Sequence, residues 1–338
     1  MSDTPVNIEI VQAKVQRGIW KGLLSILFII GLLWLVAEKV FQEDWTLSLD
    51  RIHWPTLLLG WTFMVGTMGI LGLRWRILLP TTTASRSFFA ATLSSGLLVN
   101  YALPGPMGEI MGAWLLEKED QTPLSIGITS SMLARLIGLL TAALGAIGLW
   151  SFVTVDIPSV QWLLQLLIFG IAAGALLLIL LMRGAKPFHQ WSLQKDTDHP
   201  IRQVSAAFLS LTQLSFLQIS QAFFYSALGH GTAFLGVWIS LQALGTEPSA
   251  TDIAFAYLVG TCCGTVAFLF PGSQFTWDAI FIGLLTSTAG YDIAAATGAV
   301  AILRIEQIAM MLFGAIPLIW LLWKQRLAEA PSNGTQQT

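Results

Sequence analysis

The sequence predicts an all-α polytopic membrane protein with about six full transmembrane helices and two re-entrant Pro-Gly broken hairpins, arranged as an inverted repeat. Three observations support this fold class. Of the 338 residues, 55% are hydrophobic and only 11% are charged, whereas a soluble chain has about 25% charged residues. Two apolar stretches are broken at comparable places in the two halves, by Pro104-Gly105 and Pro271-Gly272. Similar polar residues follow each break.

The breaks are informative because a lipid-facing backbone must satisfy its own hydrogen bonds. Proline removes an N–H donor and ends a helix, so a broken helix at membrane depth normally lines an enclosed or watery cavity. Two such breaks in corresponding positions are the best indication in a sequence of a transporter's substrate site. We therefore expect the site to lie near these turns.

The first half of the chain begins with the spans Ile19–Ala37 and Pro55–Leu79. The next apolar run, Phe88–Leu103, reaches only about 24 Å as a helix, which is short of the roughly 30 Å hydrocarbon core. We interpret it as a half-helix that stops at Pro104 and returns through Gly108–Leu116.

The middle of the chain contains two further spans, Leu124–Trp150 and Trp162–Met182. The polar segment Arg183–Arg202 is expected to be the longest loop. Residues Ile201–Thr212 then have the spacing of a short interfacial helix. Its apolar side would carry Val204, Phe208 and Leu211, with Gln203, Ser205 and Ser210 elsewhere.

The second half repeats the order of the first. A long and unusually polar span, Leu214–Leu244, is followed by Ile253–Phe270, which ends at Pro271. Trp277–Leu285 is the expected returning limb of this second hairpin. Ile293–Trp323 closes the membrane region.

These elements define the expected domain organisation. Residues 1–18 form a cytoplasmic N-terminal segment, and residues 19–325 form a single membrane domain. The first repeat covers about residues 55–150 and the second about residues 201–323. Residues 326–338 are expected to be a disordered cytoplasmic tail.

Charge placement predicts the orientation, because cytoplasmic loops carry an excess of Lys and Arg. An odd number of crossings separates the two hairpins, so they should open from opposite faces. One face collects the basic residues Lys14, Arg17, Lys21, Arg74, Arg76, Arg86, Lys118, Arg183, Lys186, Lys195, Arg202, Lys324 and Arg326. The other face has Lys39 and Arg51. We expect a bacterial-type inner (plasma) membrane with both termini in the cytoplasm.

Five ionisable residues fall at membrane depth: Glu109, Arg135, Asp278, Arg304 and Glu306. Each would cost about 2.5 to 3.5 kcal/mol at the centre of an isolated helix, so they should face the protein interior and pair. Their order repeats, since each half supplies a Pro-Gly turn, an acid on the returning limb and an arginine in the next span. We expect these groups to converge near the midplane.

The arginines are candidates for binding an anion such as a lipid phosphate, because guanidinium matches phosphate oxygens in a bidentate way. Half-helix N-termini at Met107 and Gln274 would add N–H donors. The candidate substrate-binding residues are Asn100, Pro104, Gly105, Glu109, Arg135, Pro271, Gly272, Asp278, Arg304 and Glu306.

Other roles for the same residues stay open. Arg135 could pair with Glu109, and Arg304 with Asp278 or Glu306, purely to hold the hairpins in place. The Asn100 amide could cap the broken helix end. A lone histidine in a span, such as His230, is more often hydrogen-bonded to a neighbour than a proton carrier. Gln218 and Gln221 are interpreted as interhelical contacts.

Several short motifs resemble a known family. They are Arg74-Trp75-Arg76, Leu98-Val99-Asn100, Leu103-Pro104-Gly105, Gly108-Glu109 to Ala113-Trp114, Ala134-Arg135-Leu136-Ile137-Gly138, Pro271-Gly272 with Asp278, and Leu303-Arg304. Together they resemble the lysylphosphatidylglycerol synthase transmembrane region, also called the flippase-like membrane family, over roughly residues 18 to 325. The resemblance implies a lipid translocase fold with two re-entrant hairpins.

The expected function is that of a lipid flippase, with a membrane lipid as substrate. The chain stops after the membrane region, so we expect no aminoacyltransferase activity and no catalytic residues. We also expect no cofactor and no bound metal, and the sequence lacks a G-x-x-x-x-G-K-[ST] nucleotide loop. Two alternatives remain: a lipid-linked transferase, and a non-transporting subunit that recruits a lipid-synthesis enzyme through Arg183–Arg202. No nucleic-acid partner is expected.

Overall fold

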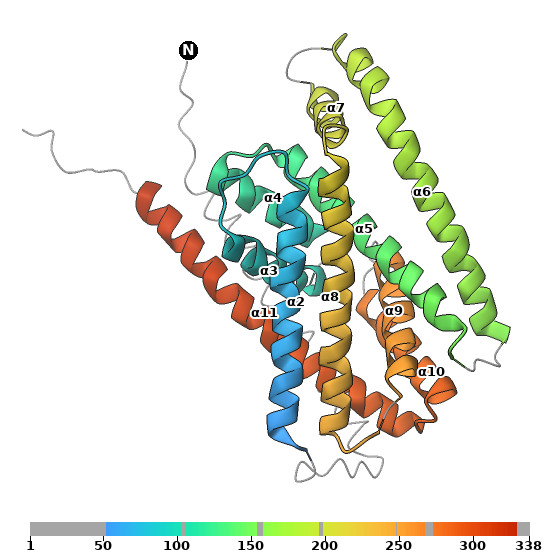
Figure 1. Ribbon diagram of the computed structural model, residues 1–338. Helices are drawn as coiled ribbons and strands as arrows, with labels where there is room; N and C mark the ends of the chain where they lie inside the picture. The colour runs from blue at the N-terminus through green and yellow to red at the C-terminus, as the bar shows by residue number, and fades with distance from the viewer. Residues whose placement is uncertain are drawn as a thin grey trace, which may run out of the picture. The chain divides into compact units, whose positions relative to one another are not determined.

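The computed structural model describes residues 52–102, 106–153, 158–195, 199–247, 249–267 and 273–329, and the regular elements in these residues are all helices. The contacts divide the chain into the units Met1–Ser48 and Leu49–Thr338, and every described residue belongs to the second. Its helices are α2 (Trp54–Ile77), α3 (Arg86–Ala102), α4 (Met107–Asp120), α5 (Leu124–Trp150), α6 (Pro158–Ser192), α7 (Pro200–Leu211), α8 (Phe216–Ala243), α9 (Ala250–Val266), α10 (Ser273–Thr288) and α11 (Ile293–Glu329) (Figure 1).

Four of the described helices are long and apolar enough to cross a membrane. They are Trp54–Ile77, Leu124–Trp150, Phe216–Ala243 and the part Ile293–Ile316 of α11. Each coincides with a predicted span. The predicted span Ile19–Ala37 lies outside the described residues, and the predicted span Trp162–Met182 lies within α6.

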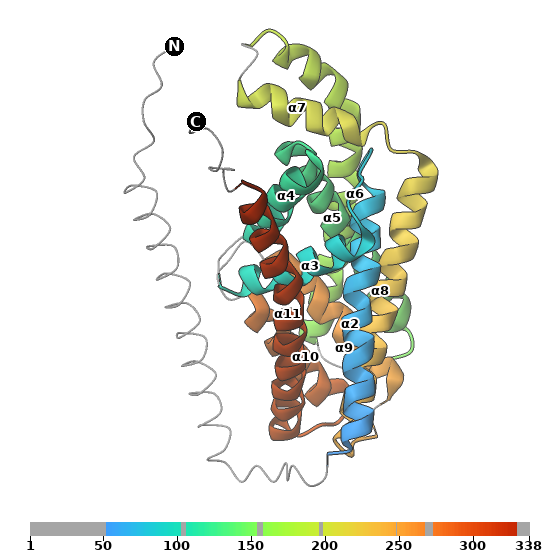
Figure 2. The ribbon, with the colours of Figure 1, turned by 90° about the vertical axis from the view of Figure 1, so that its left-hand side faces the viewer.

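Helices α2 and α8 lie side by side and run in opposite directions (Figure 1 and Figure 2). At the start of α2, the His53 amide donates to the Ala243 carbonyl at the end of α8. At the other end, Gln218 near the start of α8 donates to the Ile77 carbonyl. The expectation that Gln218 makes an interhelical contact is therefore confirmed.

The first hairpin consists of α3 and α4, which pack against each other. A Cβ atom added to Gly108 would lie 2.1 Å from the Gly96 carbonyl oxygen, so the two backbones touch and glycine is required there. Thr82 before α3 donates a hydrogen bond to Asp120 at the end of α4. The start and the end of this hairpin therefore lie side by side.

The second hairpin consists of α9 and α10, which are also packed together. Gly260 on α9 lies against Trp277 on α10. Thr246 before α9 lies beside Tyr291 after α10, so this hairpin too returns to the end where it entered. Because α2 and α8 are antiparallel, the hairpins that follow them enter from opposite ends of the α2/α8 pair.

Each hairpin packs on the last helix of the other half. Helix α11 packs on α3, and α5 packs on α9. The Ser95 hydroxyl donates to the Gly314 carbonyl at 2.9 Å, which fixes the α3–α11 contact. On the other side, Gly145 of α5 lies against Leu258 of α9.

The prediction that Arg183–Arg202 forms a long loop is wrong. Helix α6 continues to Ser192, and α7 begins at Pro200, so the connection is limited to residues 193–199. The prediction failed because the segment is polar overall, although it forms a helix with one buried side. Ala185 and Ser192 lie on that side. The Ser192 and Ser205 hydroxyls are 2.6 Å apart and join α6 to α7.

Helix α7 is confirmed as a short helix, and the structure shows which of its residues pack on the protein. Ser205 and Ala207 are fully buried, whereas Val204 is exposed. A small hydroxyl that bonds across to α6 allows closer approach than the larger Val204 would. The predicted tail is also partly wrong, because α11 continues to Glu329 and includes residues 326–329. These are good helix formers, and no proline follows until Pro331.

Candidate functional site

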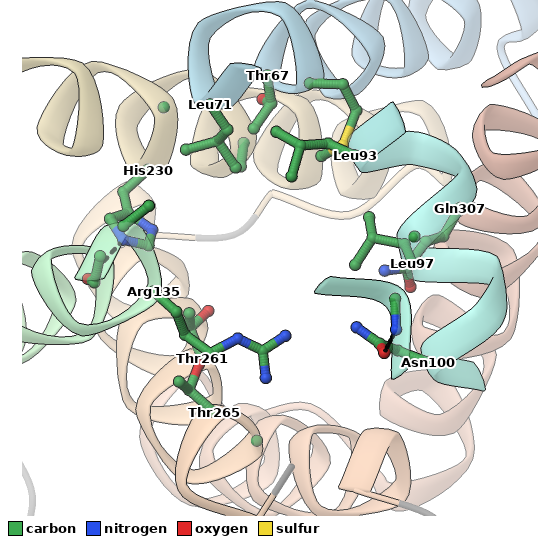
Figure 3. A pocket seen from close by; sticks show the side chains of 18 of the residues that line it. Thr67, Leu71, Leu93, Leu97, Asn100, Arg135, His230, Thr261, Thr265 and Gln307 are labelled. Carbon is green, nitrogen blue, oxygen red and sulfur yellow. Dashed lines mark hydrogen bonds between the residues drawn. The ribbon is translucent and has the colours of Figure 1, made fainter. Parts of the chain in front are cut away.

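A cavity of about 340 Å³ lies where the two halves meet. It is lined by residues from α2, α3, α4, α5, α8, α9, α10 and α11. In Figure 3, Arg135 points into the cavity from α5, with Asn100 of α3 and Gln307 of α11 on the opposite side. His230 of α8 and Thr261 and Thr265 of α9 also line the cavity in this view. Both hairpins and the helices that follow them thus contribute to one cavity.

The first ion pair joins Glu109 on α4 to Arg135 on α5. Their side chains are 12% and 23% exposed, so both are largely removed from solvent. Asn100 on α3 holds the carboxylate from the other limb of the hairpin, since its Nδ2 donates to Glu109 Oε2 at 3.1 Å. Its Oδ1 accepts from the Gly108 amide at 2.6 Å. The expected capping role of Asn100 is confirmed, and Gly108 offers no unpaired donor.

The second ion pair joins Asp278 on α10 to Arg304 on α11. Arg304 Nε donates to Asp278 Oδ1 at 2.8 Å. The guanidinium also donates to Gln307 one turn further along and lies 5.1 Å from the centre of the Trp277 ring. Trp277 stacks on Phe281, which is fully buried. The second half therefore repeats the acid–arginine arrangement of the first with different supporting side chains.

The structure brings four of the predicted site residues to the cavity wall: Asn100, Glu109, Arg135 and Arg304. Asp278 is connected to the cavity through Arg304. Glu306 is 6% exposed, lies outside the cavity lining and accepts hydrogen bonds from the Ser240 hydroxyl. Pro104, Gly105, Pro271 and Gly272 lie outside the described residues.

His230 is hydrogen-bonded to a neighbouring helix, as expected. Its Nε2 lies 2.9 Å from the Gly138 carbonyl of α5, and since a carbonyl can only accept, this nitrogen donates. The other ring nitrogen lies 3.4 Å from the Tyr257 hydroxyl of α9. His230 therefore joins three helices at the cavity wall.

Arg74 is a cavity residue that sequence reasoning missed. Its position near the end of a predicted span is typical of a topology signal, yet it lines the cavity together with Arg135 and Arg304. Its Nη1 donates to the buried Ser226 hydroxyl of α8 at 3.1 Å. A Cβ atom on Gly138 would lie 2.5 Å from this Nη1, so glycine makes room for the guanidinium. One feature of the sequence could have indicated that Arg74 lies in the protein interior. It falls within the apolar helix and not after its end.

The chemistry that this arrangement allows is recognition of an anion. Three guanidinium groups supply donors on the wall of a cavity whose remaining lining is mostly apolar, threonine or aromatic. Guanidinium groups pair with phosphate and carboxylate oxygens. Within the described ranges, no three His, Cys, Asp or Glu side chains are grouped as they would be to hold a metal ion.

Comparison with family models decides the family. The model described as the lysylphosphatidylglycerol synthase TM region matches residues 22–324. The chain belongs to this family. Comparison with curated proteins and with solved structures finds no significant match. Membership of the lysylphosphatidylglycerol synthase TM family and the apolar helices identify the chain as a multi-pass membrane protein, and the family is linked to lipid-related processes.

Proposed function

We propose that the protein is a lipid flippase that moves an amphipathic lipid, with an anionic or polar headgroup, across the cytoplasmic membrane. The observation that carries this proposal is that Arg135 and Arg304, one from each half, line the same cavity. A cationic side chain inside the membrane costs free energy, so such residues are rare. Those that occur often mark substrate or ion pathways.

The architecture supports an inverted repeat made of α2–α5 and α8–α11. The antiparallel α2/α8 pair and the reciprocal packing of α11 on α3 and α5 on α9 are the contacts that a two-fold axis in the membrane plane would generate. In this proposal α3–α4 and α9–α10 are re-entrant hairpins that enter from opposite faces, among about six full spans. The cavity between them would then open to either side in turn.

In the proposed mechanism, the two carboxylates occupy the guanidinium groups until the headgroup of a lipid replaces them. Before a lipid binds, Glu109 and Asp278 pair with Arg135 and Arg304, so neither arginine is left as an uncompensated buried charge. A headgroup with acceptor oxygens replaces one or both carboxylates on the guanidinium groups, while the acyl chains remain in lipid. Exchange of one partner for another needs less free energy than exposure of a bare charge.

Leaflet exchange of tagged lipids in proteoliposomes tests the proposal. We compare the wild type with Arg135→Gln and Arg304→Gln, which keep a polar side chain but remove the charge. Arg183→Gln is the matched control, because Arg183 is an exposed arginine on α6. We expect exchange in the wild type and the control, and strongly reduced exchange in both cavity variants.

The same set of variants separates the proposal from its rivals. Loss of function with Arg183→Gln, together with full function of both cavity variants, would favour a subunit that docks a lipid-synthesis enzyme through the α6–α7 surface. Turnover of a lipid-linked substrate by the purified wild type, without leaflet exchange, would favour a transferase. In the proposal itself the chain is a transporter without enzymatic activity.

A further inference from the structure

Glu306 is a buried acid that the proposed mechanism does not use. It lies on α11, is 6% exposed and does not line the cavity. Both of its carboxylate oxygens lie within hydrogen-bond distance of the Ser240 hydroxyl on α8, at 2.9 and 3.0 Å. Among the described residues the ion pairs are the two described above, and neither includes Glu306.

The charges on the neighbouring helices are engaged elsewhere. Helices α2, α3, α8 and α10 pack on α11. The acidic, basic and histidine side chains of these four helices are Arg74, Arg76, Arg86, His230 and Asp278. The first two arginines and His230 donate to oxygens of other residues. Arg86 is exposed, and Asp278 is paired with the arginine of α11.

The remaining charges of α11 are too far away to compensate Glu306. The next one along the helix is Lys324, about 27 Å further on at 1.5 Å per residue. An ionised carboxylate without a charged partner is costly in apolar surroundings, and such a group takes up a proton instead. A protonated carboxyl group can both donate to the Ser240 oxygen and accept from its hydroxyl. The surroundings of Glu306 are therefore those of a neutral acid.

The contact between Glu306 and Ser240 lies where three helices meet. A Cβ atom added to Gly60 of α2 would collide with the Ser240 hydroxyl oxygen, so α2 touches this contact directly. About one turn further into the protein, Met64 of α2 and Val237 of α8 line the cavity. The contact of α2, α8 and α11 thus lies beside one end of the cavity.

On its other side, the contact is close to the end of the α2/α8 pair. Ser240 is about 5 Å along the helix from Ala243, the last residue of α8. At this end lies a hollow lined by Gln242, Gly245, Thr246 and Glu247. The contact therefore separates the cavity from the end of the pair where α2 begins and α8 ends.

We propose that Glu306 is a proton-binding site that controls this end of the cavity. With the proton bound, Glu306 holds Ser240, and the contact of α2, α8 and α11 stays closed. When the proton passes to water at this end, the ionised carboxylate needs hydration and leaves Ser240, so the contact opens. The inference rests on the alternating opening in the proposed function and adds a proton as the ligand that controls it. Because the proton favours the closed arrangement, closure should strengthen as the pH falls and weaken as it rises.

Infrared spectroscopy of the purified protein tests for the bound proton without requiring transport. A protonated carboxyl group has a carbonyl band that an ionised carboxylate lacks. We compare the wild type with Glu306→Gln at neutral pH, and Glu247→Gln is the matched control because Glu247 is exposed. We expect the band in the wild type and in the control, and its loss in Glu306→Gln. A band of equal intensity in all three proteins, or none in the wild type, would overturn the inference.

Labelling of a cavity residue tests the control of opening. Ala233 of α8 lines the cavity about one turn beyond Val237. The Ala233→Cys variant is labelled in intact cells with a membrane-impermeant maleimide, and the protein without this cysteine gives the background. Each rate is divided by that of the same cysteine in Glu306→Gln at the same pH, because thiol reactivity itself rises with pH. Glu306→Gln keeps a neutral side chain and so represents the protonated state.

We expect this ratio to rise about 2- to 10-fold from mildly acidic to mildly alkaline pH, as expected for one hydrogen bond. A ratio that does not change with pH would overturn the control of opening by Glu306. Ser240→Ala removes the same hydrogen bond at every pH, so its Ala233→Cys should be labelled faster than in the wild type even in acid. Equal rates there would also overturn the inference, which keeps the test decisive if Glu306→Gln does not fold.

Leaflet exchange by the wild type in proteoliposomes is measured separately from both tests. Exchange without the infrared band and without pH-dependent labelling would mean a flippase that Glu306 does not control. The band and the labelling pattern without exchange would keep the proton site and reject the flippase. Failure of the proton site and failure of the proposed function are therefore distinguishable.

Discussion

Arg135 on α5 forms an ion pair with Glu109 on α4, across the junction between the first hairpin and the helix that follows it. The second half reproduces this relationship with Arg304 and Asp278. In both cases an acid on the returning limb of a hairpin meets an arginine on the next helix. The pairs therefore serve two purposes, since they hold each hairpin against its own half and keep two guanidinium groups at the cavity wall.

Removal of one carboxylate should destabilise the protein. Glu109→Gln leaves Arg135 without its charged partner in a largely buried position, at a cost of about 3 to 5 kcal/mol. Unfolding in detergent, followed by tryptophan fluorescence, measures this loss. Glu119→Gln is the control, because Glu119 is exposed on the same helix and should change stability by less than about 0.5 kcal/mol. Equal stability of the two variants would mean that the pair contributes nothing.

Helix contact at the first hairpin should not tolerate a methyl group. Gly108→Ala places a Cβ atom against the Gly96 carbonyl, and overpacking of this kind costs about 1 to 3 kcal/mol. Gly69→Ala on α2 is the control, because nothing lies within 4 Å of its added Cβ atom. Alanine favours a helix over glycine, so the control should match or exceed wild-type stability in thermal unfolding. A Gly108→Ala protein as stable as the control would contradict the close approach of α3 and α4.

The end of the first hairpin should show acid sensitivity. Burial opposes ionisation of Asp120, but hydrogen bonds from Thr122 and Thr82 outweigh it and hold the pKa of Asp120 below its ordinary value. A group with a lowered folded-state pKa stabilises the protein fully above its unfolded pKa of about 3.9, and this contribution is lost as the pH falls through the folded pKa. The stability difference between wild type and Asp120→Asn should therefore be largest at neutral pH and shrink in acid. A difference that does not vary with pH would refute the role of this carboxylate.

The two hairpins should open on opposite sides of the membrane. Glu119 near the end of α4 and Glu247 before α9 are exposed, at the ends where the two hairpins enter. Single Glu119→Cys and Glu247→Cys variants can be labelled in intact cells with a membrane-impermeant maleimide. We expect Glu247→Cys to react before lysis and Glu119→Cys to react only after lysis. The native Cys262 is buried and Cys263 partly buried, so the wild type is the background control. Labelling of both variants from one side would contradict the inverted arrangement.

The sequence was a good guide to the helices for a physical reason. Long apolar runs bounded by charges leave the chain few alternatives at membrane depth, and Leu124–Trp150 was predicted to the residue. Polarity was a poor guide to loops, because the segment from Arg183 to Ser192 forms helix and buries its small residues against α7. A pattern of polar residues cannot show whether a small side chain such as Ser205 is covered by another helix.

The candidate site was predicted in part. The repeated order of acid and arginine correctly indicated the pairs of Glu109 with Arg135 and Asp278 with Arg304. The sequence could not show the partner of Glu306. Residues two apart on a helix point to different sides, and this carboxylate accepts from Ser240 of α8 and does not meet Arg304. It also missed Arg74, because an arginine near the end of a span resembles a topology signal unless the packing partner Ser226 is known.

The most direct test of the account is to fill the cavity without altering any charge. Leu97 on α3 lines the cavity (Figure 3), and Leu97→Trp should occupy it. Leu144→Trp is the matched control, because Leu144 is exposed on α5. Both variants are reconstituted after their folding has been checked, and leaflet exchange of a tagged phospholipid is measured. The account predicts wild-type exchange with Leu144→Trp and loss of exchange with Leu97→Trp. Full exchange by a folded Leu97→Trp protein would show that lipid headgroups do not pass through this cavity.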